Sequence, residues 1–116
     1  MAIAVTTTKN SLAQYYGSLG AYIGMATSAP GSTATPSGEV SGGSPAYARK
    51  LTTWGGPASG AITGTAVTID TPAATITYIL VGSAASGANM IDNASVTSVV
   101  MSGQGQVVVT PTYTQT

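Results

Sequence analysis

Residues 75–81 read Thr-Ile-Thr-Tyr-Ile-Leu-Val and form the most apolar stretch of the chain. β-Branched and aromatic side chains fit the pleated surface of a sheet. A short uncharged run of this kind is typical of a strand that is covered on both faces. The stretch therefore predicts a central strand, around which the rest of the fold is arranged.

Other strand-like runs lie on both sides of this stretch. In chain order they are residues 3–7, 21–27, 47–54, 66–71, 90–92, 96–101 and 106–113. The last two flank Ser102-Gly103-Gln104-Gly105, so they are expected to pair as a hairpin. One helix that ends near residue 18 is predicted from apolar residues at helical spacing, namely Leu12, Tyr15, Tyr16 and Leu19. The expected fold class is mainly β: an antiparallel β-sandwich or barrel of about six to eight short strands with one short N-terminal helix.

The length of 116 residues fits a single domain, residues 1–116. Residues 1–8 are expected to form an N-terminal arm. Residues 28–44 are almost wholly Ser, Gly, Pro, Thr and Ala, which predicts a long loop. No apolar run approaches the roughly 20 residues of a membrane helix, and the first residues lack the features of a secretion signal. We therefore expect synthesis in the cytoplasm without an export address in the chain itself.

Charge is unusually scarce in this sequence. Charged residues make up 5% of the chain, against about 25% in a typical domain, and there is no His and no Cys. The charged residues are Lys9, Glu39, Arg49, Lys50, Asp70 and Asp92. No spacing motif links Asp70 with Asp92 as a catalytic carboxylate pair, and no motif supports a Ser–Lys dyad. We therefore expect no enzyme, no catalytic residues, no cofactor and no metal.

The same scarcity limits the partners. Three basic residues cannot make the field that nucleic acid or an anionic membrane surface attracts, so neither is an expected partner. A net charge of zero promotes association between proteins. We therefore expect much of the surface to be covered by other copies or by neighbouring proteins, although a monomer kept soluble by its hydroxyl groups is the alternative.

Five residues are candidates for such an interface. Tyr47, Arg49 and Trp54 include the residue types that are enriched where proteins bind one another. Ile3 and Val5 supply the apolar side chains of the expected arm. Trp54 taken alone fits a core position somewhat better, Arg49 alone could be an ordinary surface charge, and aromatic faces can also stack on sugars.

Residues 38–54, Gly-Glu-Val-Ser-Gly-Gly-Ser-Pro-Ala-Tyr-Ala-Arg-Lys-Leu-Thr-Thr-Trp, resemble a family of small virion proteins of tailed bacteriophages, especially those that infect actinobacteria. The resemblance extends to Tyr22–Gly31, to the turn Ala84–Gly87 and to the final strand Gly105–Tyr113. Two departures are Lys50-Leu51, where a more neutral strand is expected, and Asn89, which replaces the second glycine of a Gly-Gly turn.

The resemblance implies a non-enzymatic virion structural protein that is assembled in the host cytoplasm. The first hypothesis is a capsid decoration protein that cements the outer shell, binding the major capsid protein or other virion proteins as a homo-oligomer such as a trimer. The alternatives are a minor tail or tail-fibre protein, and a carbohydrate-binding module that contacts the host surface through Trp54 and nearby tyrosines.

Overall fold

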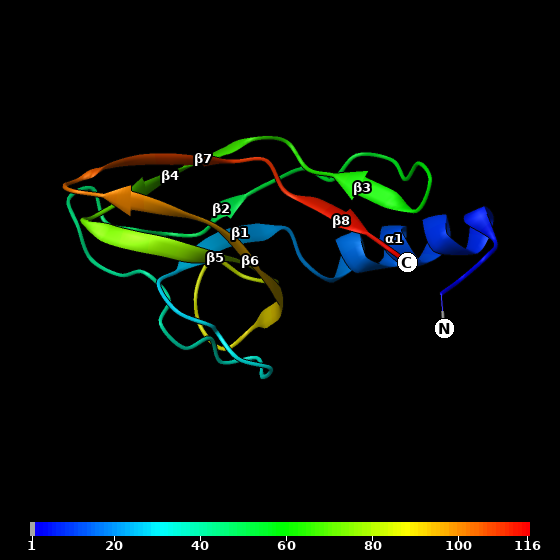
Figure 1. Ribbon diagram of the computed structural model, residues 1–116, viewed down its shortest axis with the longest axis horizontal. Helices are drawn as coiled ribbons and strands as arrows, with labels where there is room; N and C mark the ends of the chain where they lie inside the picture. Colours follow the sequence, from blue (N-terminus) through cyan, green and yellow to red (C-terminus); the bar gives the residue numbers. More distant parts are fainter. Residues whose placement is uncertain (1) are drawn as a thin grey trace.

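The computed structural model describes residues 2–116, so Met1 of the expected arm lies outside the described residues. The described residues measure 46 × 25 × 24 Å and contain one helix followed by eight strands (Figure 1). These are α1 (Thr6–Leu19), β1 (Tyr22–Ala26), β2 (Lys50–Leu51), β3 (Ala61–Thr63), β4 (Val67–Thr71), β5 (Ala74–Gly82), β6 (Met90–Met101), β7 (Gly105–Val109) and β8 (Thr112–Thr114). The mainly β class and the single N-terminal helix are confirmed.

The strands form one main sheet and two small ones. The main sheet has the antiparallel order β2-β1-β5-β6, and the two-stranded sheets pair β3 with β8 and β4 with β7. The β4–β7 ribbon lies over one face of the main sheet, and the β3–β8 ribbon lies beside α1 (Figure 1). Across residues 2–116 the sheets do not close into a barrel.

β5 is central, as its sequence predicts, because it pairs with β1 on one side and β6 on the other. Its C-terminal half, including Leu80 and Val81, is buried, whereas Thr75 near its start is exposed. The prediction of a strand covered on both faces therefore holds only for that half.

The main core fills the space between the main sheet and the β4–β7 ribbon. It joins the buried side chains Ile23, Met25, Val40, Val67, Ile69, Ile76 and Val81. A second, smaller cluster contains Ala26, Leu80 and Met90. The alternation of side chains along β1 and β5 supplies both clusters, because successive residues of a strand point to opposite faces.

The expected strand over residues 3–7 does not form. α1 begins at Thr6 with Val5 as its extended N-cap residue, and the Lys9 N–H donates to the Val5 carbonyl at 3.1 Å. Residues 2–5 have no strand partner, so only Ala2–Val5 remain outside the helix. The helix packs closely at Gly17, which lies against Trp54 and Ile62. A Cβ atom added to Gly17 would come 3.0 Å from the Ile62 Cδ1, so a larger residue would not fit without a shift.

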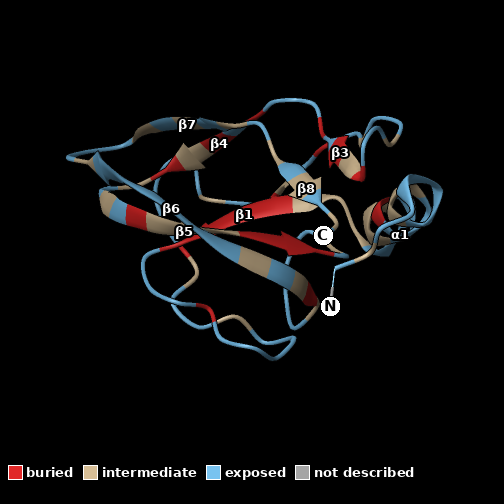
Figure 2. Cartoon of the chain, turned by 45° about the vertical axis from the view of Figure 1, so that its right-hand side comes forward, coloured by how far each residue is buried: buried red, intermediate tan, exposed pale blue. Residues whose placement is uncertain are grey.

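The predicted hairpin of residues 96–101 with 106–113 is wrong. β6 continues from Met90 to Met101 and pairs with β5, while β7 pairs with β4. The registers explain the difference, because Ala74 faces Met101 and Thr71 faces Gly105. The connection from β4 to β5 and the connection from β6 to β7 therefore lie at the same end of the molecule, and each one crosses between the β4–β7 ribbon and the main sheet. The two strands therefore diverge into different layers (Figure 2).

The central position of β5 leads to a stability prediction. Leu80→Ala removes a side chain that is fully buried, so we expect the free energy of unfolding to fall by about 2–5 kcal/mol in urea denaturation. The control is Val100→Ala on β6, where the side chain is exposed and the expected change is within about 0.5 kcal/mol. Equal losses in the two variants would contradict this placement of the core.

Candidate functional site

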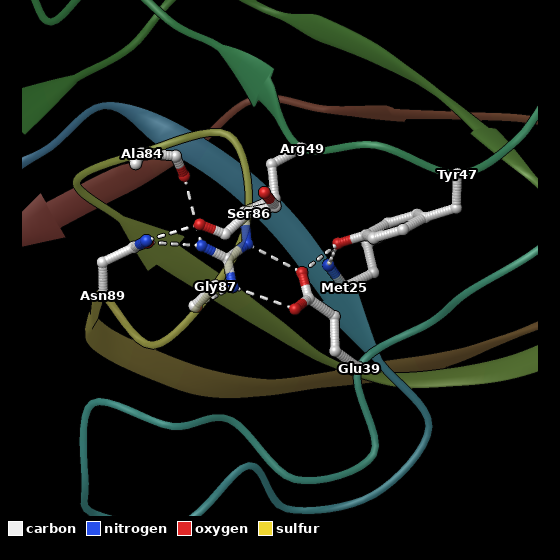
Figure 3. A network of polar contacts seen from close by, with 8 residues as sticks. All are labelled: Met25, Glu39, Tyr47, Arg49, Ala84, Ser86, Gly87 and Asn89. Carbon is white, nitrogen blue, oxygen red and sulfur yellow. Dashed lines mark hydrogen bonds and ion pairs between the residues drawn. The ribbon is translucent and has the colours of Figure 1, made fainter.

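The first candidate feature is an ion pair that uses two of the few charges of the chain. Arg49 Nε donates to Glu39 Oε2 at 2.7 Å, and Arg49 Nη2 donates to Glu39 Oε1 at 2.9 Å (Figure 3). Arg49 is only 3% exposed. Such a bidentate pair is strong and directional because the planar guanidinium matches the carboxylate. It fixes residue 39 of the long loop against the chain that leads into β2.

The remaining donors of Arg49 reach a second loop. Nη1 donates to the Asn89 Oδ1 at 2.6 Å and to the Ala84 carbonyl at 3.1 Å, and Nη2 donates to the Gly87 carbonyl at 3.1 Å. One guanidinium therefore holds the loop before β6 as well as the loop before β2. Asn89, which departs from the resembled Gly-Gly turn, supplies one of these acceptors.

Tyr47 completes the network. Its hydroxyl donates to Glu39 Oε2 at 2.7 Å and accepts from the Met25 N–H of β1 at 3.0 Å. Burial raises the pKa of Tyr47, and the hydrogen bond with Glu39 raises the pKa of Arg49 further above its ordinary value. Gly24 permits this arrangement, because an added Cβ there would come 2.5 Å from the Tyr47 hydroxyl oxygen.

The second candidate feature is a groove of about 300 Å³ between β6 and the β7–β8 segment. It exists because the two segments diverge instead of forming a hairpin. Ile79, Val81 and Trp54 are among the apolar side chains that line it, and Val96 lines it from β6. The groove is therefore mostly aliphatic and aromatic.

An aromatic cluster lies at one end of this groove. The rings of Tyr16 and Tyr113 stack with centroids 3.6 Å apart, and Trp54 meets Tyr16 edge to face at 6.2 Å. The Tyr16 hydroxyl donates to Asp92 Oδ2 at 2.8 Å, although the two residues are 76 positions apart. Burial, and after it the contact with Asp92, raises the pKa of Tyr16. The cluster thus connects α1, β6 and β8.

The third feature is the exposed β6 strand at the edge of the main sheet (Figure 2). Val100 is 72% exposed on β6, and Val108 is 65% exposed on β7. No charged residue follows Asp92 in the sequence. Sheet edges usually carry charges or prolines that prevent pairing with other chains. β6 has a bulge opposite Thr77 but no charge beyond Asp92.

The structure separates the five predicted interface residues. Tyr47 and Arg49 meet in the network and have an intrachain role, so the interface role predicted for them stays a prediction. Trp54 is half-buried and borders both the main core and the groove. Ile3 is half-buried and Val5 is 59% exposed, before the start of α1.

Sequence reasoning missed Glu39, Asn89 and the pairing of Tyr16 with Tyr113. Glu39 is the one acidic residue near the two adjacent basic residues 49 and 50, and this signal could have indicated an ion pair. The tyrosine stack had no such signal, because it depends on β8 pairing with β3 beside α1. Across residues 2–116, no group of three or more His, Cys, Asp or Glu residues could hold a metal ion, and no helix is long and apolar enough to span a membrane.

Comparison with known proteins identifies a family that covers most of the chain. The model of a family described as "Podophage GP4 fiber I protein gp80" matches residues 10–114, which is most of the chain. No curated protein and no solved structure matches.

The network gives a prediction for Glu39→Gln. This change keeps the shape of the side chain but leaves the buried Arg49 without its counter-charge, so we expect a loss of about 3 kcal/mol in the free energy of unfolding. Adding Arg49→Met should recover part of that loss in urea denaturation, because the unpaired charge is then gone. Asp70→Asn, at a partly exposed carboxylate that accepts a hydrogen bond from Gln106, is the control. A loss no larger than that of the control would contradict a stabilising network.

The half-buried side chains of Tyr16 and Tyr47 predict weaker stability in alkali. The ordinary pKa of tyrosine is 10.0, and those of Tyr16 and Tyr47 are raised. The folded chain holds these protons more tightly than the unfolded chain, so the free energy of unfolding should fall as the pH rises above 10. Tyr16→Phe and Tyr47→Phe should each reduce this dependence, with Tyr15→Phe as the control at an exposed position. A wild-type stability that stays constant between about pH 9 and pH 11 would refute the expectation.

Proposed function

Since this chain belongs to the podophage GP4 fiber I protein gp80 family, we propose that it is a non-enzymatic component of a phage fibre that binds copies of itself and neighbouring virion proteins. Family membership makes it a bacteriophage virion protein, in agreement with the resemblance found in the sequence. The family description names a fibre, and this favours the tail-fibre alternative over capsid decoration. An actinobacterial host and assembly in the host cytoplasm stay predictions.

The uncharged surface from β6 to β8 carries the proposal. Val96, Val99 and Val100 are exposed on β6, and no charged residue follows Asp92 in the sequence. Exposed apolar side chains that are grouped on one sheet edge are typical of an interaction site. Most soluble homo-oligomers are symmetric, so a self-complementary contact of this surface would build a two-fold dimer, and a head-to-tail contact would close into a ring such as a trimer.

The mechanism we propose is contact alone. Strand edges supply hydrogen bonds, valine and tyrosine side chains supply apolar area, and the rigid Arg49 network keeps the loops in one arrangement while neighbours bind. Binding to neutral partners through such a surface depends little on salt, because few charges take part.

The first test is the mass and the location of the protein. Light scattering should give a multiple of 11.3 kDa that persists at high salt. Labelling of intact particles should find a few copies at the tail. Hundreds of copies on the shell would favour capsid decoration instead, and a monomer that is absent from particles would refute the proposal.

A further inference from the structure

We propose that the groove between β6 and β8 receives residues Ala2–Val5 of a second copy of this chain as an added strand. The inference rests on the proposed self-association and names the surfaces that would carry it. A groove filled by a neighbour in this way would be complete only in the oligomer.

The flanks of the groove are suited to an added strand. Within residues 2–116, β6 pairs only with β5, and β8 pairs only with β3. Each therefore keeps one edge without a strand partner, and both line the groove through residues such as Ala94, Val96 and Thr112. An extended peptide binds such an edge by main-chain hydrogen bonds, while alternate side chains enter the space beside it.

The chemistry of the groove favours an apolar peptide over a sugar. The Tyr16 hydroxyl already donates to Asp92, the Trp54 indole N–H donates to the Gly20 carbonyl at 2.9 Å, and the Tyr113 hydroxyl donates to Gln115 at 2.8 Å. The polar ends of all three rings are thus used within the chain. A sugar site needs polar groups that are free to bind its hydroxyls, whereas an uncharged strand needs mainly apolar area and strand edges.

Residues 2–5, Ala-Ile-Ala-Val, have the properties that this groove requires. The segment has no charge, belongs to no helix or strand, and ends at Val5 with extended backbone angles of φ −87° and ψ 116°. Val5 is 59% exposed. None of these residues lines the groove of its own chain. The segment lies just before the first residue of α1, whereas the groove contacts α1 at Tyr16, close to the other end of the helix. The segment therefore starts far along the helix from the groove of its own chain, and the geometry points to exchange between copies.

Exchange of this kind can be reciprocal within a two-fold dimer, because each copy presents one segment and one groove, or it can run head to tail from copy to copy. Such contacts repeat around a ring and close when the rotation between copies permits it. They bury apolar side chains from both partners, and Asp92, the one carboxylate that lines the groove, already accepts a hydrogen bond from Tyr16.

Cysteine cross-linking tests the inference directly, because the chain has no cysteine of its own. Val5→Cys and Val96→Cys are introduced into separate copies that carry tags of different size and are co-expressed. We expect a disulfide that joins one tagged copy to the other. The matched control pairs Val5→Cys with Val108→Cys, which is exposed on the outer side of β7 and should cross-link at least tenfold less.

The outcomes separate the inference from the proposed function. If Val5→Cys fails to link to Val96→Cys, or links equally to Val108→Cys, while the wild type stays oligomeric, the groove assignment is overturned and self-association stands. A link from Val96→Cys to a different virion protein in assembled particles would also overturn it. A wild type that is monomeric would refute the proposed self-association itself.

Charge substitutions give an independent measurement. Val96→Lys and Val5→Lys should each raise the dissociation constant of the oligomer at least tenfold in sedimentation, and Val108→Lys should leave it nearly unchanged. The double variant should be little worse than either single one, because both changes break the same contact. Additive losses would mean that Val5 and Val96 act at separate places and would contradict the proposal.

Discussion

The buried ion pair between Arg49 and Glu39 is the contact on which the arrangement of the loops depends. Removing a guanidinium from water costs several kcal/mol unless its donors find acceptors, and here they find a carboxylate, one side-chain amide and two carbonyls. The long loop buries few apolar side chains, chiefly Val40 and Pro30. Its position therefore follows from this polar network more than from hydrophobic burial, and the network selects one arrangement of the two loops.

Strong local signals made part of the fold predictable from the sequence. The apolar run at residues 75–81 gave the central strand, and the composition of residues 28–44 gave the long loop. The predicted hairpin failed because its two strands have better partners in different sheets, and the turn between them spans a corner. The short strand expected at residues 3–7 failed because it has no partner, so Thr6 and Thr7 join the helix instead.

The candidate site was less predictable, for a physical reason. Residue type indicated that Arg49 and Trp54 matter, but the role of each depends on which distant segment meets it. Arg49 is surrounded by acceptors from two loops, whereas Trp54 lies beside a groove that exists only because β6 and β7 diverge. Tyr16 and Asp92 are 76 positions apart, and only the position of α1 beside β8 and β6 brings them together. Such contacts follow from topology, which local patterns do not contain.

The few charges of the chain are nearly absent from its exposed sheet edge, β6. Glu39 and Arg49 neutralise each other inside, Asp92 is hydrogen-bonded to Tyr16, and Asp70 accepts from Gln106. None of the charges lies on β7 or β8, and β6 carries only Asp92, near its start. A sheet edge with exposed valines and without charges is a hazard for a protein that remains free, because it can pair with any extended chain. Under the proposed self-association the same edge is covered by other copies, and a surface without charge then lowers the desolvation cost of that contact.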